Sequence, residues 1–563
     1  MRFSIDIARR RDNSLSNDCA ALWLLRMLGN PGFACAMADL WSRACFMTEH
    51  CANSINEKQA RGNPKLTDAP SVLVKENNRC NILLFLQILL FPRLSPGKRK
   101  GRIMIKPKVG FIVYGVHKDG LKDPMGTPFI DAALVARAKK TLRMAGLDLV
   151  EHPVVIATKT EARTCLASFK KRDDVDALVF FSGTWVWAAH LMAAVRDYAM
   201  TGRGLVFWTH PGSQGWRPVG GLVMHGGLLE VGIPHRFVYG ACDNATDVGQ
   251  ITAWCRASAM RQRLNLSTFG AFGGRGMGQT CGAVDPSQWM RLFGIDIDSR
   301  DTTQLLKTAR AISAAELKDA RRRLQPLFHE PIPAGEVADR SIRLYLAIRK
   351  IVARERWAGY TIQSFPGLGD EYSATCFAQS MMLEEGVGTS TLNDFNTLMT
   401  VKLLTDLSPE RVYYGDLQHI DKRRKEIKII GDGACPPSLA GRLGPAGFAE
   451  HGIPTEGEAG GLSIKLVCKP GEGVLARLGR TQGRFEMAFC RCTVFEPPRG
   501  QLKRRQLECG IPFWPHAFVT AHADMEALLQ VWNNEYACLG YGAHLYEELK
   551  AFCEQTGIHA VAL

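Results

Sequence analysis

The sequence lacks the regular cysteine spacing of metal sites and disulfide frameworks. It has 17 cysteines in 563 residues, yet no Cys-x-x-Cys pair occurs, and the closest two are Cys490 and Cys492. Zinc sites and disulfide-stabilised secreted domains are both recognised by regular cysteine spacing. We therefore expect free, mostly buried thiols in a reducing cytoplasm.

The sequence also lacks a long hydrophobic run. The stretch that comes nearest, residues 82–91, stops at Pro92. A membrane-spanning helix needs roughly 18 or more apolar residues, and this stretch lies too far from Met1 to form the core of a signal peptide. No membrane association is expected.

Positive charge is plentiful but is not gathered. The net charge is +15 and the pI is near 9.1, yet the basic runs at 321–323, 422–425 and 503–505 are short and mixed with acidic or apolar residues. Nucleic-acid-binding proteins usually concentrate their cations on one stripe beside a recognisable motif. We interpret the runs as solvated faces, and no nucleic acid partner is expected.

Residues 1–103 differ from the remainder of the chain. They show no sustained helical or strand period and end in a Pro-Gly-Lys-Arg-Lys-Gly-Arg run, whereas a clean strand pattern follows Met104. We hypothesise that Met104 is the biological start and that the preceding part is a translated upstream region. A genuine but poorly packed extension is the alternative.

From Met104 onward, strand and helix patterns alternate, which is typical of a parallel sheet covered by helices on both faces. The last third changes to strands separated by Gly- and Pro-rich turns. The predicted fold class is therefore α/β, with two doubly wound Rossmann-like domains and a mainly β C-terminal domain. The predicted boundaries are 1–103 for the extension, 104–265 and 266–390 for the two α/β domains, and 391–563 for the last domain. Within them we expect strands at 109–114, 177–181, 204–208, 236–239, 463–468, 485–492 and 518–521 and helices at 128–145, 187–200 and 245–263.

A glycine-rich phrase opens the second predicted domain. Four of the six residues 273–278 are glycine, and Asp285-Pro286 and a helix pattern follow. Glycines let backbone amides approach a polar ligand closely. Arg275, the charged side chain inside this loop, is the best candidate to bind an anion or a sugar oxygen.

Three segments together resemble the L-fucose/L-arabinose isomerase family over roughly residues 104–563. They are the glycine phrase with residues 285–298, the acidic segments around Glu371 and Asp394, and the closing run 534–558. The resemblance implies a fucose isomerase-like fold and an intramolecular oxidoreductase that interconverts an aldose and a ketose through a metal-stabilised cis-enediol. It also implies a homo-oligomer, a trimer or hexamer, in which the first domain of one subunit completes the site of another.

By this resemblance, Glu371 and Asp394 correspond to paired metal-binding carboxylates. The sequence pattern places Glu371 after a Gly-x-Gly turn, at the start of a helix that ends near Met382. Moving a proton between adjacent carbons needs acid–base groups and a cation that polarises both oxygens, and two carboxylates at a hard cation can serve these roles. The alternative is helix capping, especially for Asp394, because Asp before a helix is a common N-cap. Neighbouring carboxylates that could take the role instead are Asp370, Glu384 and Glu385.

The third metal ligand departs from the family pattern. Relatives place a histidine between Asn and Tyr, whereas this chain has Glu535 there, and Gly431 and Asp432 stand where relatives carry His-Cys. A glutamate can bind Mn²⁺ or Mg²⁺ through oxygen, so Mn²⁺ or another divalent cation is the expected cofactor. Loss of the metal is the alternative. If the metal is lost, the protein is a catalytically altered or inactive relative that acts as a carbohydrate-binding or regulatory protein.

Substrate-lining residues are expected in the first domain as well. Trp185, His225 and other aromatic residues and histidines crowd strand ends and glycine-rich loops, where sugars and other ligands of parallel sheets bind. A packed aromatic core is the alternative. His516 and His544 could replace the missing histidine, but each is more often an ordinary core or surface residue.

Overall fold

The computed structural model describes residues 104–116, 122, 126, 128–212, 216–431, 434–450, 458–508 and 514–563. All of these belong to one compact unit, Pro96–Leu563. The predicted N-terminal extension and the hypothesis about Met104 fall almost wholly outside the described residues and stay predictions.

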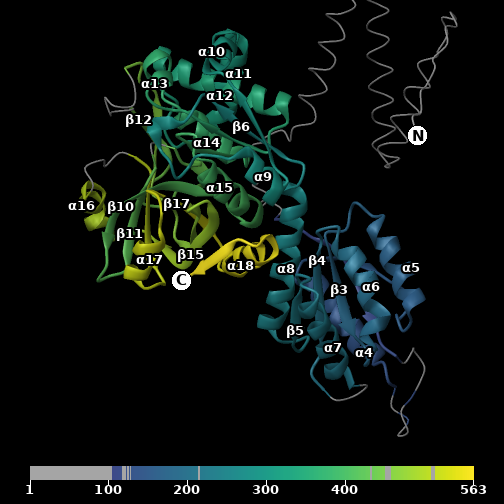
Figure 1. The fold of residues 1–563 in the computed structure, drawn as a ribbon. Helices are drawn as coiled ribbons and strands as arrows, with labels where there is room; N and C mark the ends of the chain where they lie inside the picture. The colour runs from purple at the N-terminus through teal and green to yellow at the C-terminus, as the bar shows by residue number, and fades with distance from the viewer. Residues whose placement is uncertain are drawn as a thin grey trace, which may run out of the picture. The chain divides into compact units, whose positions relative to one another are not determined.

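The first layer of the fold is a five-stranded parallel sheet in the order β2-β1-β3-β4-β5 (Figure 1). Successive residues of β1 point to opposite faces, so Phe111 shares a core with α4 and α8, and Ile112 shares another with α5, α6 and α7. The strands are β1 Lys108–Tyr114, β2 Asp148–Glu151, β3 Ala177–Ser182, β4 Gly204–Thr209 and β5 Arg236–Tyr239, and the helices are α4 Ala132–Met144, α5 Lys159–Lys170, α6 Ala188–Ala199, α7 Arg217–Glu230 and α8 Ala245–Leu264.

A second parallel sheet has four strands in the order β7-β6-β8-β9. The strand order reverses beside β6, and in open α/β sheets ligands bind outside the carboxyl ends of the strands at such a reversal. The strands are β6 Thr268–Phe272, β7 Asp296–Arg300, β8 Gly359–Ile362 and β9 Gly388–Thr391, and the helices are α9 Pro286–Phe293, α10 Thr302–Arg310, α11 Ala314–Leu324, α12 Glu336–Glu355, α13 Gly367–Glu371, α14 Cys376–Glu385 and α15 Phe395–Leu407.

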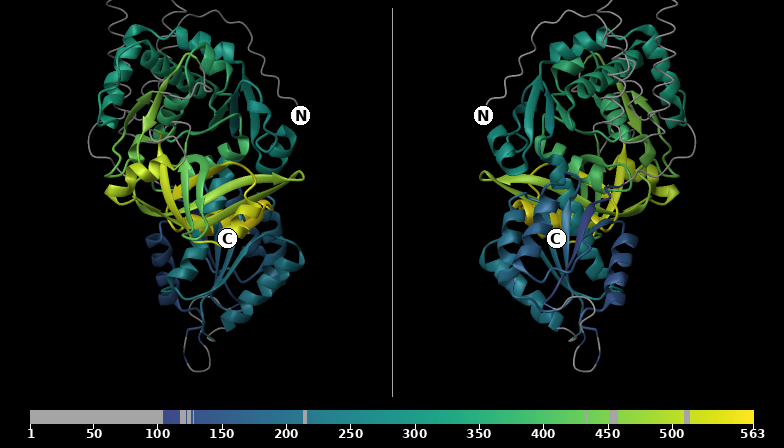
Figure 2. Two further views of the ribbon diagram at one scale, coloured as in Figure 1. Left: turned by 90° about the vertical axis from the view of Figure 1, so that its left-hand side faces the viewer. Right: turned by 90° about the vertical axis from the view of Figure 1, so that its right-hand side faces the viewer.

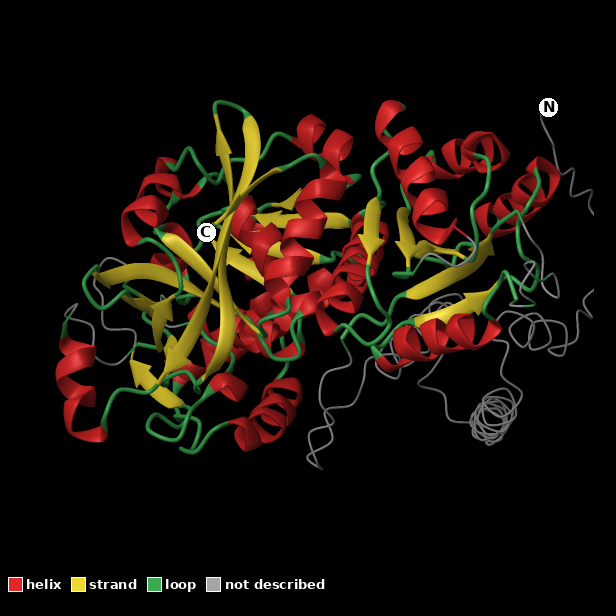
Figure 3. Ribbon diagram, turned by 90° about the horizontal axis from the view of Figure 1, so that it is seen from below, coloured by secondary structure: helices red, strands yellow, loops and turns green. Residues whose placement is uncertain are grey.

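The C-terminal part is mainly β (Figure 3). Strand β14 pairs with both β17 and β15, so six antiparallel strands in the order β14-β17-β10-β11-β16-β15 close on themselves, and β18 adds to β15 in parallel. The elements are β10 Tyr413–Asp421, β11 Glu426–Ile430, β12 Gly447–Glu450, β13 Leu462–Lys465, β14 Gly471–Thr481, β15 Arg484–Phe495, α16 Leu502–Leu507, β16 His516–Ala521, α17 Met525–Val531, β17 Tyr536–Tyr541, α18 Leu545–Thr556 and β18 His559–Ala562.

The last helix, α18, packs against α8 of the first sheet. Gln555 donates a hydrogen bond to the carbonyl of Trp254 at 2.9 Å, and Glu548 forms an ion pair with Arg256 at 2.8 Å. In the two side views of Figure 2 the yellow closing elements lie next to the blue and teal elements of the first sheet. The end of the chain therefore contributes to the packing of its first sheet.

The mixed α/β fold with parallel sheets and a mainly β C-terminal part confirms the predicted fold class at this level. The fucose isomerase-like arrangement of domains and the domain boundaries stay predictions. Within the described ranges, no helix is both long and apolar enough to cross a membrane.

Candidate functional site

Three loops meet at the carboxyl edge of the four-stranded sheet. The glycine loop follows β6, Gln363 follows β8, and Leu392 to Asp394 follow β9. The amide of Gly274 donates to the side-chain oxygen of Gln363 at 2.8 Å, and the amide of Gly276 donates to the carbonyl of Leu392 at 3.2 Å. These bonds hold the loops together where the strand order predicts a ligand site.

The backbone at this edge is tightly turned. Leu392 and Asn393 both have positive φ, 56° and 54°, a conformation that is uncommon for residues other than glycine. A Cβ atom at position 276 would lie 2.7 Å from the Cα of Leu392. Glycine at 276 is therefore required by the close approach of the glycine loop to the corner after β9.

The segment before β17 reaches the same edge. The Asn534 amide donates to the Cys281 sulfur at 2.7 Å, and the Gln279 amide donates to the Glu535 carboxylate. The Thr391 hydroxyl donates to that of Tyr536 at 2.9 Å. The structure thus places Glu535 beside Gln279, directly after the glycine loop, and its role as a metal ligand stays a prediction.

Asp394 caps helix α15. Its carboxylate accepts hydrogen bonds from the amide and the hydroxyl of Thr397, each at 2.9 Å, and pairs with Arg477 of β14 at 2.9 Å. Asp394 is 0% exposed and Arg477 is 1% exposed. Burial lowers the pKa of the Arg477 guanidinium, but attraction to Asp394 outweighs it, and the net effect raises that pKa. The capping interpretation of Asp394 is confirmed; its metal and catalytic roles stay predictions.

Glu371 lies differently from expectation. The sequence pattern predicts that Glu371 begins a helix running to residue 382, but Glu371 instead ends the short α13, and α14 begins only at Cys376. Its side chain is exposed. The expectation of a helix N-terminus at Glu371 is therefore wrong, and its metal and catalytic roles stay predictions.

The neighbouring carboxylates are engaged in structural contacts. Each accepts a hydrogen bond from the backbone or from a side chain of another element. Asp370 accepts from the Glu458 amide at 3.2 Å, Glu384 from the Ser438 amide at 2.9 Å, and Glu385 from the Tyr345 hydroxyl and from Arg349 at 3.0 Å.

The donor set does not fit a three-ligand metal site. Among the described residues, no group of three or more histidine, cysteine or acidic side chains is placed to hold a metal ion. Asp394 is already paired with Arg477, and Glu535 accepts from Gln279. His516 is buried against the Trp514 carbonyl, and burial lowers its pKa to about 4. We therefore derive no reaction step through a cation.

The predicted substrate residues of the first sheet lie toward opposite ends of it. Trp185 follows β3 at the carboxyl edge and packs on Trp187, with 4.4 Å between ring centroids. His225 of α7 lies with its Nδ1 2.8 Å from Nε2 of His235, which directly precedes β5 at the amino edge. The structure does not bring Trp185 and His225 together. Arg275 is exposed on the glycine loop.

Two residues missed by the sequence reasoning stand at the site with unused acceptors. Asn393 donates to the Phe272 carbonyl at 3.3 Å and to that of Gly274, and Gln279 donates to Glu535. In each amide the carbonyl oxygen is buried and has no hydrogen-bond partner within the described part of the chain. A buried acceptor without a donor is unfavourable, so each of these two oxygens calls for a donor that the described residues do not supply. An amide beside a glycine loop is too common a pattern to have signalled this.

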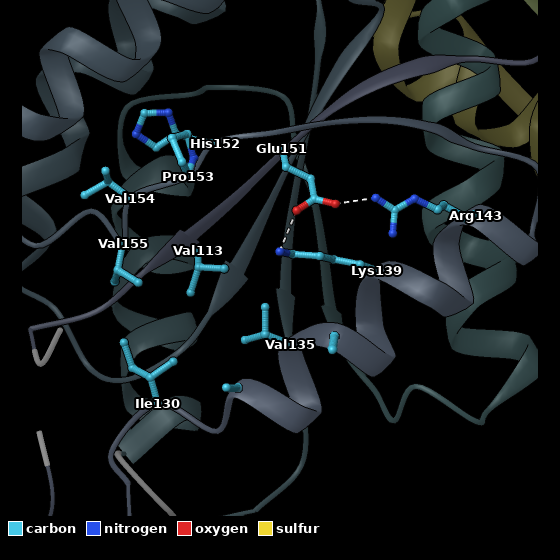
Figure 4. Close-up of a pocket in the computed structure, with 12 residues that line it drawn as sticks. Val113, Ile130, Val135, Lys139, Arg143, Glu151, His152, Pro153, Val154 and Val155 are labelled. Atoms are coloured by element: carbon cyan, nitrogen blue, oxygen red, sulfur yellow. Dashed lines mark hydrogen bonds and ion pairs between the residues drawn. The ribbon is translucent and has the colours of Figure 1, made fainter. Parts of the chain in front are cut away.

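Two pockets lie away from this edge. A pocket of about 340 Å³ lies beside α4 and β2, and valines are among the residues that line it. In this pocket Lys139 and Arg143 both point to Glu151 (Figure 4). Another, of about 260 Å³, lies between the ends of α6, α8, α9 and α18. In the first pocket both cations are already paired, so we base the candidate site on the glycine loop and its unused acceptors.

The chain therefore combines parallel α/β sheets with a polar, amide-rich edge, and it is similar to a sugar isomerase. The similar protein is sulfoquinovose isomerase of Clostridium sp. (strain MSTE9), which is 22% identical over 307 residues, covering 52% of this chain and 68% of that protein. No protein-family model matches the chain. The similarity supports sugar isomerases in general and does not single out the fucose or arabinose enzymes.

Proposed function

We propose that the protein binds a sugar at the carboxyl edge of the four-stranded sheet and interconverts its aldose and ketose forms. The similarity to a sulfoquinovose isomerase supports the reaction class. The observation that carries the site is the pair of unused buried acceptors, Asn393 Oδ1 and Gln279 Oε1. A sugar carries several hydroxyl donors, and pairing such acceptors removes an unfavourable free energy of roughly 1–3 kcal/mol each.

Each residue at this edge has a role in the proposal. Asn393 and Gln279 accept hydrogen bonds from sugar hydroxyls, and exposed Arg275 binds an anionic group or a sugar oxygen. Glu535 is exposed and oriented by Gln279. It is the carboxylate we assign to moving a proton between the two carbons and their oxygens.

The test follows the exchanged proton. Sulfoquinovose and neutral aldohexoses are incubated with the protein in D₂O, and NMR detects deuterium at the carbon next to the carbonyl. The proposal predicts incorporation with at least one sugar and its loss in Glu535→Gln. The control is Glu526→Gln, because Glu526 is a mostly exposed residue of α17 paired with Lys422. Incorporation that is equal in Glu535→Gln would remove Glu535 from the mechanism.

Carbohydrate binding without turnover is the second candidate. It is favoured by the observation that Asp394, expected to act in catalysis, is fully buried and paired with Arg477. Calorimetric binding of a sugar with no deuterium incorporation at any pH would establish it. A homo-oligomer also stays a proposal, which sedimentation of the purified protein tests.

A further inference from the structure

The corner after β9 carries a carboxylate that a sugar isomerase could use to hold a divalent cation, but here it is enclosed by protein. Of the roughly four acceptor positions of a carboxylate, three at Asp394 are taken by the Thr397 amide, the Thr397 hydroxyl and Arg477. On another side the backbone of Gly282 approaches so closely that a Cβ there would lie 2.8 Å from the Asp394 carboxylate carbon.

The Arg477 guanidinium is buried like the carboxylate and meets Asp394 through Nη2, while its Nε has no hydrogen-bond partner in the described part of the chain. Arg477 lies within β14, paired on one side with Ala488 of β15. Its Nη1 donates to the Thr397 hydroxyl, and the next residue, Leu478, donates its amide to Thr400 at 2.9 Å. Two consecutive residues of β14 therefore bind the first two turns of α15. Arg477 cannot leave Asp394 without breaking this packing.

We propose that Arg477 is a permanent internal counter-ion at Asp394 and that this carboxylate binds no divalent cation. A fixed guanidinium balances the buried charge that a metal would otherwise balance, and it repels any dication brought beside it. The corner keeps its shape, because the N-cap bonds to Thr397 remain. Within the proposed function, which this inference deepens, the ligand is then held by amide oxygens and Arg275 rather than by a cation at Asp394.

Metal response of the unmodified protein is the deciding measurement. The full chain is dialysed against EDTA, its metal content is measured by mass spectrometry, and its melting temperature is recorded with and without MnCl₂ or MgCl₂. The proposal predicts no stoichiometric metal before dialysis and the same melting temperature in EDTA and in either salt. A stoichiometric metal whose removal lowers the melting temperature, with that response abolished in Asp394→Asn, would overturn it.

Variants sharpen the test. In Arg477→Met the carboxylate loses its counter-ion, so we expect a lower melting temperature that MnCl₂ partly restores. The double variant Asp394→Asn/Arg477→Met has no charge at this corner, so we expect it to melt at a higher temperature than Arg477→Met and to show no change in melting temperature with MnCl₂. Lys422→Met is the control, because it removes the cation of a largely exposed pair with Glu526. An Arg477→Met protein that folds normally and ignores MnCl₂ would contradict the proposal.

If Arg477→Met does not fold, the measurements on the unmodified protein still decide. None of them requires a sugar. If the protein binds no sugar and its melting temperature does not respond to metal, the proposed function is contradicted and the counter-ion assignment stands.

Discussion

Two buried ion pairs of this protein have nearly the same length but different surroundings. Arg477 of β14 pairs with Asp394, which follows β9, with 2.9 Å between nitrogen and oxygen. Arg256 of α8 pairs with Glu548 of α18 at 2.8 Å. Asp394 also accepts two hydrogen bonds from Thr397. The second oxygen of Glu548 is buried without a hydrogen-bond partner in the described ranges. Burial raises the pKa of Glu548 to about 7, although Arg256 opposes the shift.

The two pairs have nearly equal lengths, but their carboxylates differ in how many partners they have. Desolvation disfavours the charged form, and only a full set of hydrogen bonds and counter-charge offsets it. Asp394 accepts two hydrogen bonds and pairs with Arg477, whereas Glu548 pairs with Arg256 through one oxygen and its other oxygen has no hydrogen-bond partner in the described ranges.

The largest effect is expected from removing Arg477. Arg477→Met leaves the Asp394 charge buried without a counter-ion, so the free energy of unfolding should fall by about 3–5 kcal/mol. Urea unfolding of Arg477→Met, Asp394→Asn and the double variant measures it, and the double variant should recover part of the loss. A loss below about 1 kcal/mol would show that Asp394 is not held as a charge.

A somewhat smaller, pH-dependent effect is expected at Glu548. Its folded-state pKa of about 7 lies above its unfolded value of 4.5, so its contribution to stability is fully present below pH 4.5 and is lost as the pH rises through 7. The free energy of unfolding of the unmodified protein, compared with that of Glu548→Gln, should therefore fall by about 3 kcal/mol between about pH 4.5 and pH 8. Urea unfolding of both proteins across this range measures the difference. A constant difference would mean that Glu548 is charged throughout.

A third prediction extends the comparison to unused acceptors at the sugar site. Gln279→Met removes the buried carbonyl oxygen at similar volume, so sugar affinity should fall about tenfold, which corresponds to about 1.4 kcal/mol. Calorimetry with the best-bound sugar measures it. Gln418→Met is the control, because Gln418 is an exposed residue of β10. Equal affinities in both variants would remove Gln279 from the site.

The smallest effect is expected where both partners face water. Lys422→Met breaks the pair with Glu526, whose side chains are 54% and 66% exposed. Exposed pairs contribute about 0–1 kcal/mol, and urea unfolding should show no more than this. A loss comparable to that of Arg477→Met would mean that burial is not what separates these pairs.

Strands β1, β3 and β4 could be predicted from the sequence because they are continuous apolar runs buried on both faces, whereas the largely uncovered β2 was not predicted. Helix α7 could not, because its four glycines and the lack of a polar face argue against a helix. The fold explains one of them, since a Cβ at Gly220 would lie 2.8 Å from the Thr184 carbonyl oxygen. This contact could not be predicted because Thr184 lies in the loop after β3, far from α7 in the sequence.

At the candidate site, the cap at Asp394 follows from local sequence, because an Asp before a helix has its partners within the next turn. Its counter-ion does not, because Arg477 lies on β14, a strand that the sequence patterns did not predict. The break after Glu371 was also invisible, since residues 372–375 carry no proline or glycine. Distant partners and local breaks are what a single sequence conceals here.

The packing of α18 on α8 bears on how the protein is made. Helix α8 is buried on most sides, and α18 covers part of it, yet the ribosome completes α8 about 280 residues before it begins α18. At roughly 5–20 residues per second, the nascent chain waits roughly 15–60 s for the helix that covers α8. Until then the apolar surface of α8 that α18 covers stays uncovered, so the order of elements along the chain sets how long this surface is open to wrong contacts.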